Sequence, residues 1–132
     1  MTPTPLKIVF HGQNAANFRQ GFEALIAPEH QVLDLSDALD QPGERAHYES
    51  ADVVIGIKLN ADMPQPVNAR LFHAPAAGTD AVNTALLPAQ CTLANCFGHE
   101  NAIAEYVIAA LLMRHVPLAR ADEDLRAQRW TY

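Results

Sequence analysis

Short apolar runs alternate with helix-like segments along the first two thirds of the chain. Between the first two runs, Phe18, Phe22, Leu25 and Ile26 recur at helical spacing, which predicts an amphipathic helix that Pro28 ends. The apolar runs predict five strands, within "LKIVFHG", "QVLDL", "ADVVIGI", "RLFHA" and "CTLAN". Apolar strands that alternate with helices are typical of a parallel sheet covered on both faces.

This alternation predicts an α/β domain over residues 1–98, flavodoxin-like and three-layered. Right-handed crossovers favour a five-stranded parallel sheet in the order 2-1-3-4-5. Ser36 is expected to cap a weak helical region interrupted at Pro42 and Gly43. "DAVNTALLP" predicts a brief helix capped by Asp80.

The last third has a different pattern. Residues 101–116 predict a long helix, which is apolar almost all round from Ala102 to Met113, with Glu105 as the only charge inside that stretch. Such a helix must be covered by protein, because it has no polar face and is shorter than the ~20 apolar residues that span a bilayer. We expect a homodimer through this helix, with Glu105 paired at the interface, and no membrane partner. A charged helical segment, "LARADEDLRAQRW", follows.

Composition narrows the classes of protein. With 132 residues and 49% hydrophobic positions, the chain has enough apolar side chains for one compact core. Nine Lys and Arg against 15 Asp and Glu give a charge of −6, which disfavours nucleic acid as a partner. The N-terminus lacks the long apolar core of a signal peptide, so a cytoplasmic location is expected. Cys91 and Cys96 lack the spacing of a zinc or redox pair and are interpreted as buried free thiols, and no metal site is expected.

Ligands of a parallel sheet bind beyond the carboxyl ends of the strands. The loop "PAAGTD" lies at such an end, and its small side chains let a ligand approach the backbone N–H groups. The alternative is a tight turn in which Gly78 takes a positive φ and Asp80 caps a helix. Lys58, after the third strand, either attracts an anion or is a solvated surface lysine. His73 is interpreted as structural or pocket-lining.

The pair His99 and Glu100 is explained by a helix start rather than by catalysis. Neighbours in sequence do not face each other on a helix. The helix dipole there favours the acid and disfavours a protonated histidine.

Four segments in fixed order carry a family resemblance: "PAAGTDAVN", "TLANCFGHE", "NAIAEYVIAALL" and "RADEDLRAQRW". The strongest pieces are Gly78-Thr79-Asp80, Asn95 and "NAIAE" from Asn101. In order and spacing they resemble the N-terminal substrate-binding domain and interdomain helix of the NAD-dependent D-isomer-specific 2-hydroxyacid dehydrogenases. The resemblance covers nearly the whole chain, although before Ala51 it is one of pattern alone.

The resemblance implies hydride transfer between NAD(P)H and a small 2-oxo or 2-hydroxy acid. It implies that the N–H groups of Ala77 and Gly78, with Thr79, hold the substrate carboxylate, and that Lys58 and Leu59 line the opposite wall. It also implies that Ile103 packs near the nicotinamide ring. Residues 99–132 would then be the interdomain and dimerisation helix and the start of a nucleotide-binding domain.

The family's dinucleotide fingerprint, G-x-G-x-x-G, occurs nowhere in the 132 residues. The family's catalytic Arg, Glu and His have no match either, so no catalytic residue is assigned. We expect neither bound NAD or NADP nor turnover from this chain alone, which resembles a fragment, a separately made domain or a truncated relative. The choice of acid and of NAD or NADP stays open.

The alternative is a stand-alone flavodoxin-like module that binds a small anion or acts in signalling. A receiver domain would need an acidic pair after the first strand and an Asp at the end of the third. The chain has His11-Gly12 and Gly56-Ile57-Lys58 there. It also lacks the Ser/Thr-rich phosphate loop of a flavodoxin, so a generic anion-binding module is the form of this alternative that remains.

Overall fold

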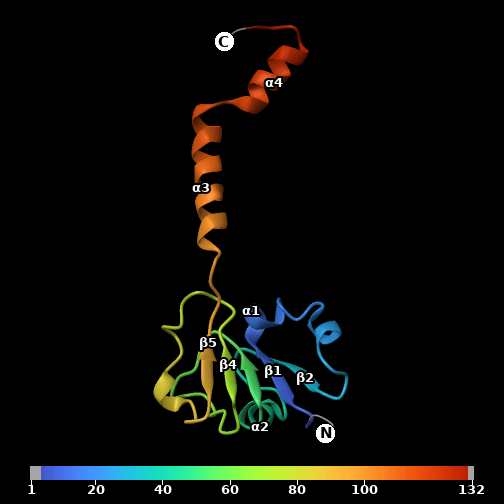
Figure 1. Ribbon diagram of the computed structural model, residues 1–132, viewed down its shortest axis with the longest axis vertical. Helices are drawn as coiled ribbons and strands as arrows, with labels where there is room; N and C mark the ends of the chain where they lie inside the picture. The colour runs from blue at the N-terminus through green and yellow to red at the C-terminus, as the bar shows by residue number, and fades with distance from the viewer. Residues whose placement is uncertain (1–3, 131–132) are drawn as a thin grey trace. The chain divides into compact units, whose positions relative to one another are not determined.

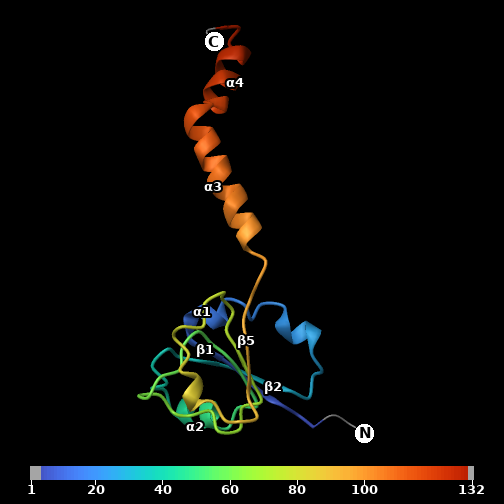
Figure 2. The same ribbon diagram turned by 60° about the vertical axis from the view of Figure 1, so that its left-hand side comes forward.

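The computed structural model describes residues 4–130, which fall into two compact units that meet between Cys96 and Phe97. The first unit holds a five-stranded sheet, shown in Figures 1 and 2. Its strands are all parallel, in the order β2-β1-β3-β4-β5, which confirms the predicted fold. The strands are β1 (Lys7–His11), β2 (Gln31–Leu35), β3 (Val53–Ile55), β4 (Leu71–His73) and β5 (Thr92–Ala94).

One face of the sheet carries the larger core. Val9, Val54 and Phe72 are in register on neighbouring strands and fully buried. The helix α2 (Glu44–Glu49) covers them with Tyr48, which is also fully buried. Loop residues from after β3 and β4 complete this cluster, among them Leu59, Ala69 and Val82.

The opposite face is covered by short helical turns. Ile8, Phe10 and Ile55 alternate with the residues of the first face, as the pleat of a strand requires. Ala15 of α1 (Gly12–Ala16) packs on them, and the ring of Phe22 meets that of Phe10 edge-on at 5.2 Å. The two faces together make the predicted three layers.

The predicted helix over Phe18, Phe22, Leu25 and Ile26 is wrong. The chain forms α1 and then a separate 3₁₀ turn, η1 (Phe22–Leu25). Gly21 lies between them with φ of 81°, a left-handed conformation that ends a right-handed helix. Leu25 is 84% exposed as a result, so the helical spacing of these apolar residues did not mark one buried face.

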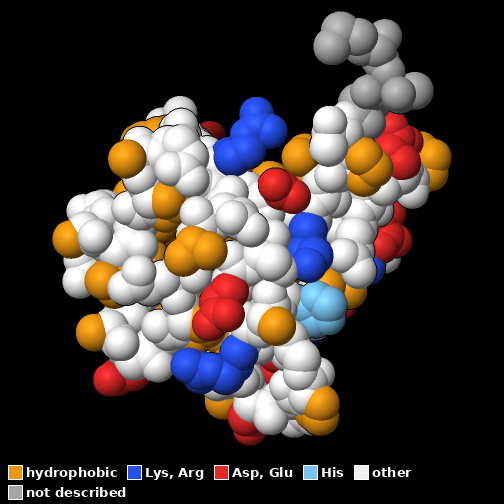
Figure 3. All heavy atoms as spheres, turned by 90° about the horizontal axis from the view of Figure 1, so that it is seen from below, with side chains coloured by type: hydrophobic (Ala, Val, Ile, Leu, Met, Phe, Trp, Pro, Cys, Tyr) orange, Lys and Arg blue, Asp and Glu red, His pale blue; other side chains and the backbone are white. Residues whose placement is uncertain are grey.

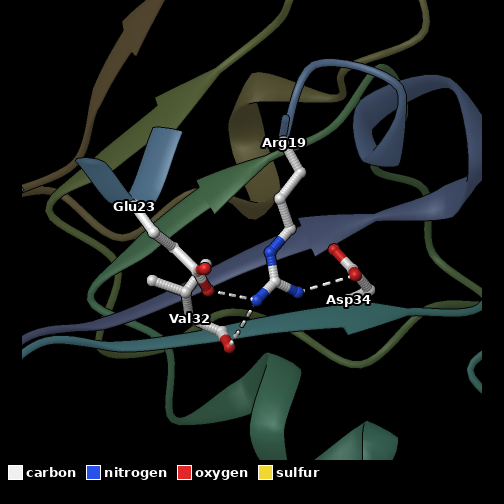
Figure 4. Close-up of polar contacts among 4 residues, drawn as sticks. All are labelled: Arg19, Glu23, Val32 and Asp34. Atoms are coloured by element: carbon white, nitrogen blue, oxygen red, sulfur yellow. Dashed lines mark hydrogen bonds and ion pairs between the residues drawn. The ribbon is translucent and has the colours of Figure 1, made fainter. Parts of the chain in front are cut away.

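Arg19 holds this irregular segment against the sheet, as Figure 4 shows. Its guanidinium donates to Glu23 of η1 and, at 2.6 Å, to Asp34 of β2, and it reaches the carbonyl oxygen of Val32 at 3.5 Å. The hydrogen bond to Glu23 is the largest cause of a raised Arg19 pKa, while burial acts against it. One side chain therefore replaces the missing helical turns as the link between η1 and β2.

Two predicted helix caps are also wrong. The short turn after β4, η2 (Thr84–Leu86), is capped by Asn83, whose side chain accepts from the N–H of Ala85 at 3.1 Å, and not by Asp80. Ser36 caps no helix, because α2 begins only after Gly43. The Ser36 hydroxyl instead donates to the buried carboxylate of Glu44.

The second unit consists of α3 (Glu100–His115) and α4 (Leu118–Arg126), visible in Figures 1 and 2. The predicted long C-terminal helix is thus present, and α3 buries none of its side chains. In α4, Arg126 pairs with Asp122 at 2.8 Å. No single helix among residues 4–130 is long and apolar enough to cross a membrane; α3 and α4, bent by 50°, meet that test only when taken together.

Charges at the end of the molecule seen in Figure 3 are mixed in sign. Acidic and basic side chains are interspersed there, and the basic ones form no continuous patch on that face. This distribution agrees with the net charge of −6. It offers no basic surface to a nucleic-acid backbone on that face.

Candidate functional site

The loop after β4 is anchored along the neighbouring strand β5. The N–H of Ala74 donates to the carbonyl of Ala94 at 2.8 Å, and the N–H of Cys96 donates to the carbonyl of Ala76 at 3.0 Å. The side-chain amide of Asn95 then donates to the carbonyl of Ala77 at 2.7 Å. At Ala76 and Ala77 the loop is therefore held through its carbonyl oxygens, by groups that follow β5.

A second link joins the far end of this loop to the segment after β3. Leu59 forms an isolated parallel bridge with Val82, through N–H to carbonyl contacts of 2.9 Å with Ala81 and Asn83. The Leu59 side chain is fully buried in the core, so its backbone carries the link. These contacts bring two of the sequence-predicted segments, around Lys58 and around Gly78, to the same edge of the sheet.

The backbone N–H groups of this loop are unused. Within residues 4–130, the N–H groups of Ala77, Gly78 and Thr79 have no hydrogen-bond acceptor. Ala77 and Gly78 are exposed and Thr79 is half-buried. Three successive donors with small neighbours are a site that an anion can occupy.

The tight-turn interpretation of the loop does not hold. Gly78 is not among the glycines with a positive φ, and Asp80 is not the helix cap. A Cβ built at Gly78 would meet one atom within 4 Å, Oδ2 of Asp80 at 3.3 Å. Glycine at this position therefore avoids a tight contact with the Asp80 carboxylate rather than providing a positive φ for a turn.

Lys58 is the cation of this region. It follows β3, is half-buried, and makes no ion pair in the part of the chain that the structure describes. Its charge is one of the causes that lower the pKa of His11. The ammonium group is thus available to an acid near the carboxyl ends of β1 and β3.

His11 and Tyr48 are features that the sequence analysis missed. His11 is 2% exposed and Tyr48 is fully buried, and their rings meet edge-on at 5.1 Å. Neither the two ring nitrogens nor the Tyr48 hydroxyl makes a hydrogen bond of standard geometry within the described chain. The sequence feature that could have indicated His11 is a polar side chain at the end of an apolar strand, directly before Gly12.

Burial sets the protonation of this pair. Burial lowers the pKa of His11. An interaction with the backbone of Asp37 and the negative charges of Asp37 and Glu44 act in the opposite direction and raise it. Burial also raises the pKa of the Tyr48 hydroxyl. Both groups are therefore held neutral inside the core.

The two cysteines are free but only half-buried, so the prediction of buried thiols is wrong. Cys96 lies with its Sγ 3.8 Å from Nε2 of His73, at the end of β4. Cys91 belongs to the edge of the larger core, and burial raises its thiol pKa. His73 thus contacts a thiol at the sheet edge that carries the open loop.

The remaining candidate residues belong to the second unit. Ile103 is in α3 of the second unit and is 56% exposed. His99 is the residue before α3, and its side chain makes no capping hydrogen bond. No group of three His, Cys, Asp or Glu side chains suited to a metal ion occurs among residues 4–130.

A hollow of about 440 Å³ lies at a different place, over the segment that leads into α2. Its lining includes Leu39, Gln41 and Arg45 and no residue of the loop after β4. The donors of Ala77 and Gly78 belong to exposed residues and lie at the surface. Comparisons of the chain with protein-family models, with curated proteins and with solved structures gave no match.

Proposed function

We propose that this chain binds the carboxylate of a small 2-oxo or 2-hydroxy acid, as the substrate-binding part of an NAD(P)-dependent D-2-hydroxyacid dehydrogenase. The observation that carries the proposal is the set of backbone N–H groups at Ala77, Gly78 and Thr79, which have no acceptor among the described residues. Each carboxylate oxygen accepts such donors well, and charge makes these hydrogen bonds about twice as strong as neutral ones.

The anchoring of the loop supports this role. Asn95 and Cys96 engage the carbonyl oxygens of Ala77 and Ala76, so the peptide planes are held while the N–H groups stay free. A donor set that is already in place needs little reorganisation when a ligand arrives. Small side chains at Ala77 and Gly78 leave room for the acid.

Lys58 supplies the charge that the amides lack. The protein carries a net charge of −6, which repels acids at long range, so an unpaired cation near the loop matters. As a flexible ammonium group it attracts the carboxylate without fixing its orientation. Orientation then comes from the amides of Ala77 and Gly78.

The described residues of the first unit do not fit a dinucleotide. In such a sheet the pyrophosphate would lie at the start of the helix after β1. There the N–H of Gln13 already donates to the Asp37 carboxylate at 3.1 Å, and α1 is five residues long. The second Asp37 oxygen lies 2.4 Å from the position of a Cβ at Gly12. The Asp37 carboxylate therefore occupies the space that a pyrophosphate would need.

The chain's part in the proposed reaction is therefore to bind and orient the acid. When bound in the enzyme, NAD(P) supplies or takes up the hydride. Ile103 is proposed to pack near the nicotinamide ring, and α3 is proposed as the dimer helix. Calorimetric titration of the purified chain with NADH is expected to give only the heat of dilution, and tight binding would contradict this assignment.

Amide chemical shifts of the isotope-labelled chain test the binding site. Pyruvate and glyoxylate should shift the signals of Ala77, Gly78 and Thr79 first, because those N–H groups change from solvent to a carboxylate partner. Shifts elsewhere but not in this loop would refute the site. Pyruvamide, which keeps the 2-oxo group and lacks the carboxylate, is the matched control and should leave the loop unchanged.

The same titration separates the two classes of function. Acetate carries the carboxylate without the 2-oxo group. If acetate binds as tightly as pyruvate, the loop belongs to a general small-anion module rather than to a 2-hydroxyacid enzyme. A clear preference for pyruvate supports the proposed substrate class.

A further inference from the structure

Cys96 and His73 come together because of the sheet register. His73, the last residue of β4, is paired with Ala94 of β5, and Cys96 follows two residues later. Residues two apart on an extended chain point to the same side. The thiol and the imidazole are therefore brought to one side of the sheet, with Sγ 3.8 Å from Nε2.

This side of the sheet is open to solvent near the pair. Along β4 and β5 the residues that share it, Leu71, His73 and Ala94, are half-buried, and Thr92 is exposed. By contrast, Phe72 on the opposite face is fully buried. Cys96 is itself only half-buried, which gives a small reagent access to this side chain.

We propose that Cys96 is a site of thiol–disulfide exchange, in which His73 accepts the thiol proton and the co-reactant is a small disulfide. A thiolate and not a thiol is the attacking species, so a base in contact with the sulfur speeds the exchange. The required tautomer of His73 carries its proton on Nδ1 and leaves Nε2 free to accept.

The step balances in atoms and electrons. The thiol proton passes from Sγ to Nε2 of His73, and the thiolate attacks one sulfur of the small disulfide. A new S–S bond to Cys96 forms as the bond within the reagent breaks. The departing thiolate takes the proton, so Cys96 is oxidised to a mixed disulfide while half of the reagent is reduced to a thiol.

The chain contains its own control. Cys91 is also free and half-buried, but burial raises the pKa of its thiol, and the thiol donates to the carbonyl oxygen of Thr92, at 3.7 Å. A carbonyl cannot take up the proton. Cys96 should therefore react at least about tenfold faster than Cys91, because a positioned base typically speeds a proton transfer by more than that factor.

The experiment uses the reduced full chain and 5,5′-dithiobis(2-nitrobenzoate) in excess, with mass spectrometry to assign each modified cysteine. Two phases are expected, the fast one from Cys96. Cys91→Ser should keep the fast phase and Cys96→Ser should remove it. In denaturant the two thiols of the wild-type chain should react at similar rates, which shows that the difference depends on the fold.

His73→Gln separates a base from a packing residue, because glutamine retains a polar side chain and cannot accept the proton. The fast phase should slow by at least about tenfold, because the positioned base that takes up the thiol proton is gone. Far-ultraviolet circular dichroism checks that the variant is folded. Equal rates for Cys91 and Cys96, or an unchanged fast phase in folded His73→Gln, would overturn the proposal.

A second readout links the thiol to the acid loop and rests on the proposed function. The Cys96 N–H donates to the carbonyl of Ala76, so a group attached to Sγ lies beside the loop that holds Gly78. Modified chain should show smaller pyruvate-induced shifts at Ala77 and Gly78 than reduced chain. If pyruvate shifts nothing in reduced chain, the proposed function fails while the exchange rates still decide the thiol proposal.

Discussion

At the scale of single residues, Gly12 and Gly21 form a matched pair. Both have a positive φ, 83° and 81°, but a Cβ at Gly12 would lie 2.4 Å from the Asp37 carboxylate, whereas one at Gly21 meets nothing within 4 Å. Gly21→Ala should cost about 1–2 kcal/mol for the left-handed backbone. Gly12→Ala should cost at least about 1 kcal/mol more, because Asp37 must move off the N–H of Gln13.

Urea unfolding of the two variants measures these costs. The comparison isolates the carboxylate contact, since the backbone strain is shared. Equal losses of stability would mean that Asp37 moves aside freely. The acid would then not be a fixed part of the loop after β1.

His11 predicts a pH dependence of stability. Burial lowers its pKa in the folded chain, while in the unfolded chain it titrates near 6.5. As pH falls through about 6.5, His11 becomes protonated in the unfolded state but not in the folded state. The stability of the folded state therefore decreases until the pH reaches the pKa of His11 in the folded chain. Above about pH 6.5 the contribution of His11 to stability is fully present. Below it, the stability changes by at most about 1.4 kcal/mol per pH unit.

Urea unfolding at several pH values between about 5 and 8, the range where histidine titrates, tests this sign. His11→Phe keeps a ring against Tyr48 and removes the titration, so its stability should vary less with pH in this window. Glu44 does not titrate in this window. Burial acts to raise the pKa of its carboxyl, but hydrogen bonds from Ser36 and Gln41 outweigh burial and lower that pKa from 4.5. A variant with the same pH dependence as the wild type would show that His11 is not the responsible group.

At the scale of elements, the contact between the end of β5 and the loop after β4 is the critical one. Asn95→Ala removes the 2.7 Å hydrogen bond to Ala77 and should cost about 1 kcal/mol. It should also weaken pyruvate binding several-fold in the amide-shift titration, since the loop loses its anchor. Gln90→Ala is the control, because the Gln90 side-chain amide donates a similar hydrogen bond, at 3.3 Å, to the carbonyl of Val67, away from the loop.

Weaker binding in both variants would point to a general loss of stability. Unchanged binding in Asn95→Ala would mean that the loop keeps its conformation without the anchor. Only a loss of pyruvate binding in Asn95→Ala, with binding retained in Gln90→Ala, agrees with a positioning role for the Asn95 side chain.

The strands were predictable and the helices of the first unit were not, for a physical reason. The parallel strand β3 is apolar throughout and β1 is apolar between Lys7 and His11, and that pattern needs no tertiary information. The segment around Gly21 has helical spacing, yet its course is decided by a left-handed glycine and by the reach of Arg19 to Asp34. A contact such as that between Arg19 and Asp34 does not change the spacing of apolar residues, so it could not be inferred from that spacing.

The candidate site was predictable in part. Small residues after β4 indicated the loop, but the choice between a turn and an open donor set needed the φ of Gly78 and the cap at Asn83. The His73–Cys96 contact depends on the β4–β5 register and could not be inferred from a spacing of 23 residues. The ring of His11 packs against that of Tyr48, which lies far along the chain, and the sequence pattern does not show this contact.

At the scale of the whole molecule, α3 predicts self-association. Ile108 and Leu111 are 56% and 57% exposed, and Tyr106, Leu112 and Met113 are more than half exposed too. Burying each is worth roughly 1.5–3 kcal/mol, enough for a few of them to offset the entropy lost when two chains associate. We therefore expect a two-fold dimer through residues 101–116.

Analytical ultracentrifugation at micromolar concentration measures the mass. The wild-type chain should sediment as a dimer, and Leu111→Asp or Ile108→Asp should shift it toward monomer. Leu25→Asp is the control, because Leu25 is 84% exposed in η1 of the first unit and should leave the dimer intact. A wild-type monomer would remove this interface.

The central claim is that the loop after β4 holds a carboxylate, and a crystal structure of the chain grown with pyruvate tests it most directly. The account predicts carboxylate oxygens about 2.7–3.2 Å from the backbone nitrogens of Ala77 and Gly78, the range of an N–H···O hydrogen bond. Pyruvate bound at another place, such as the hollow beside Leu39 and Arg45, with the loop amides left free, would contradict it.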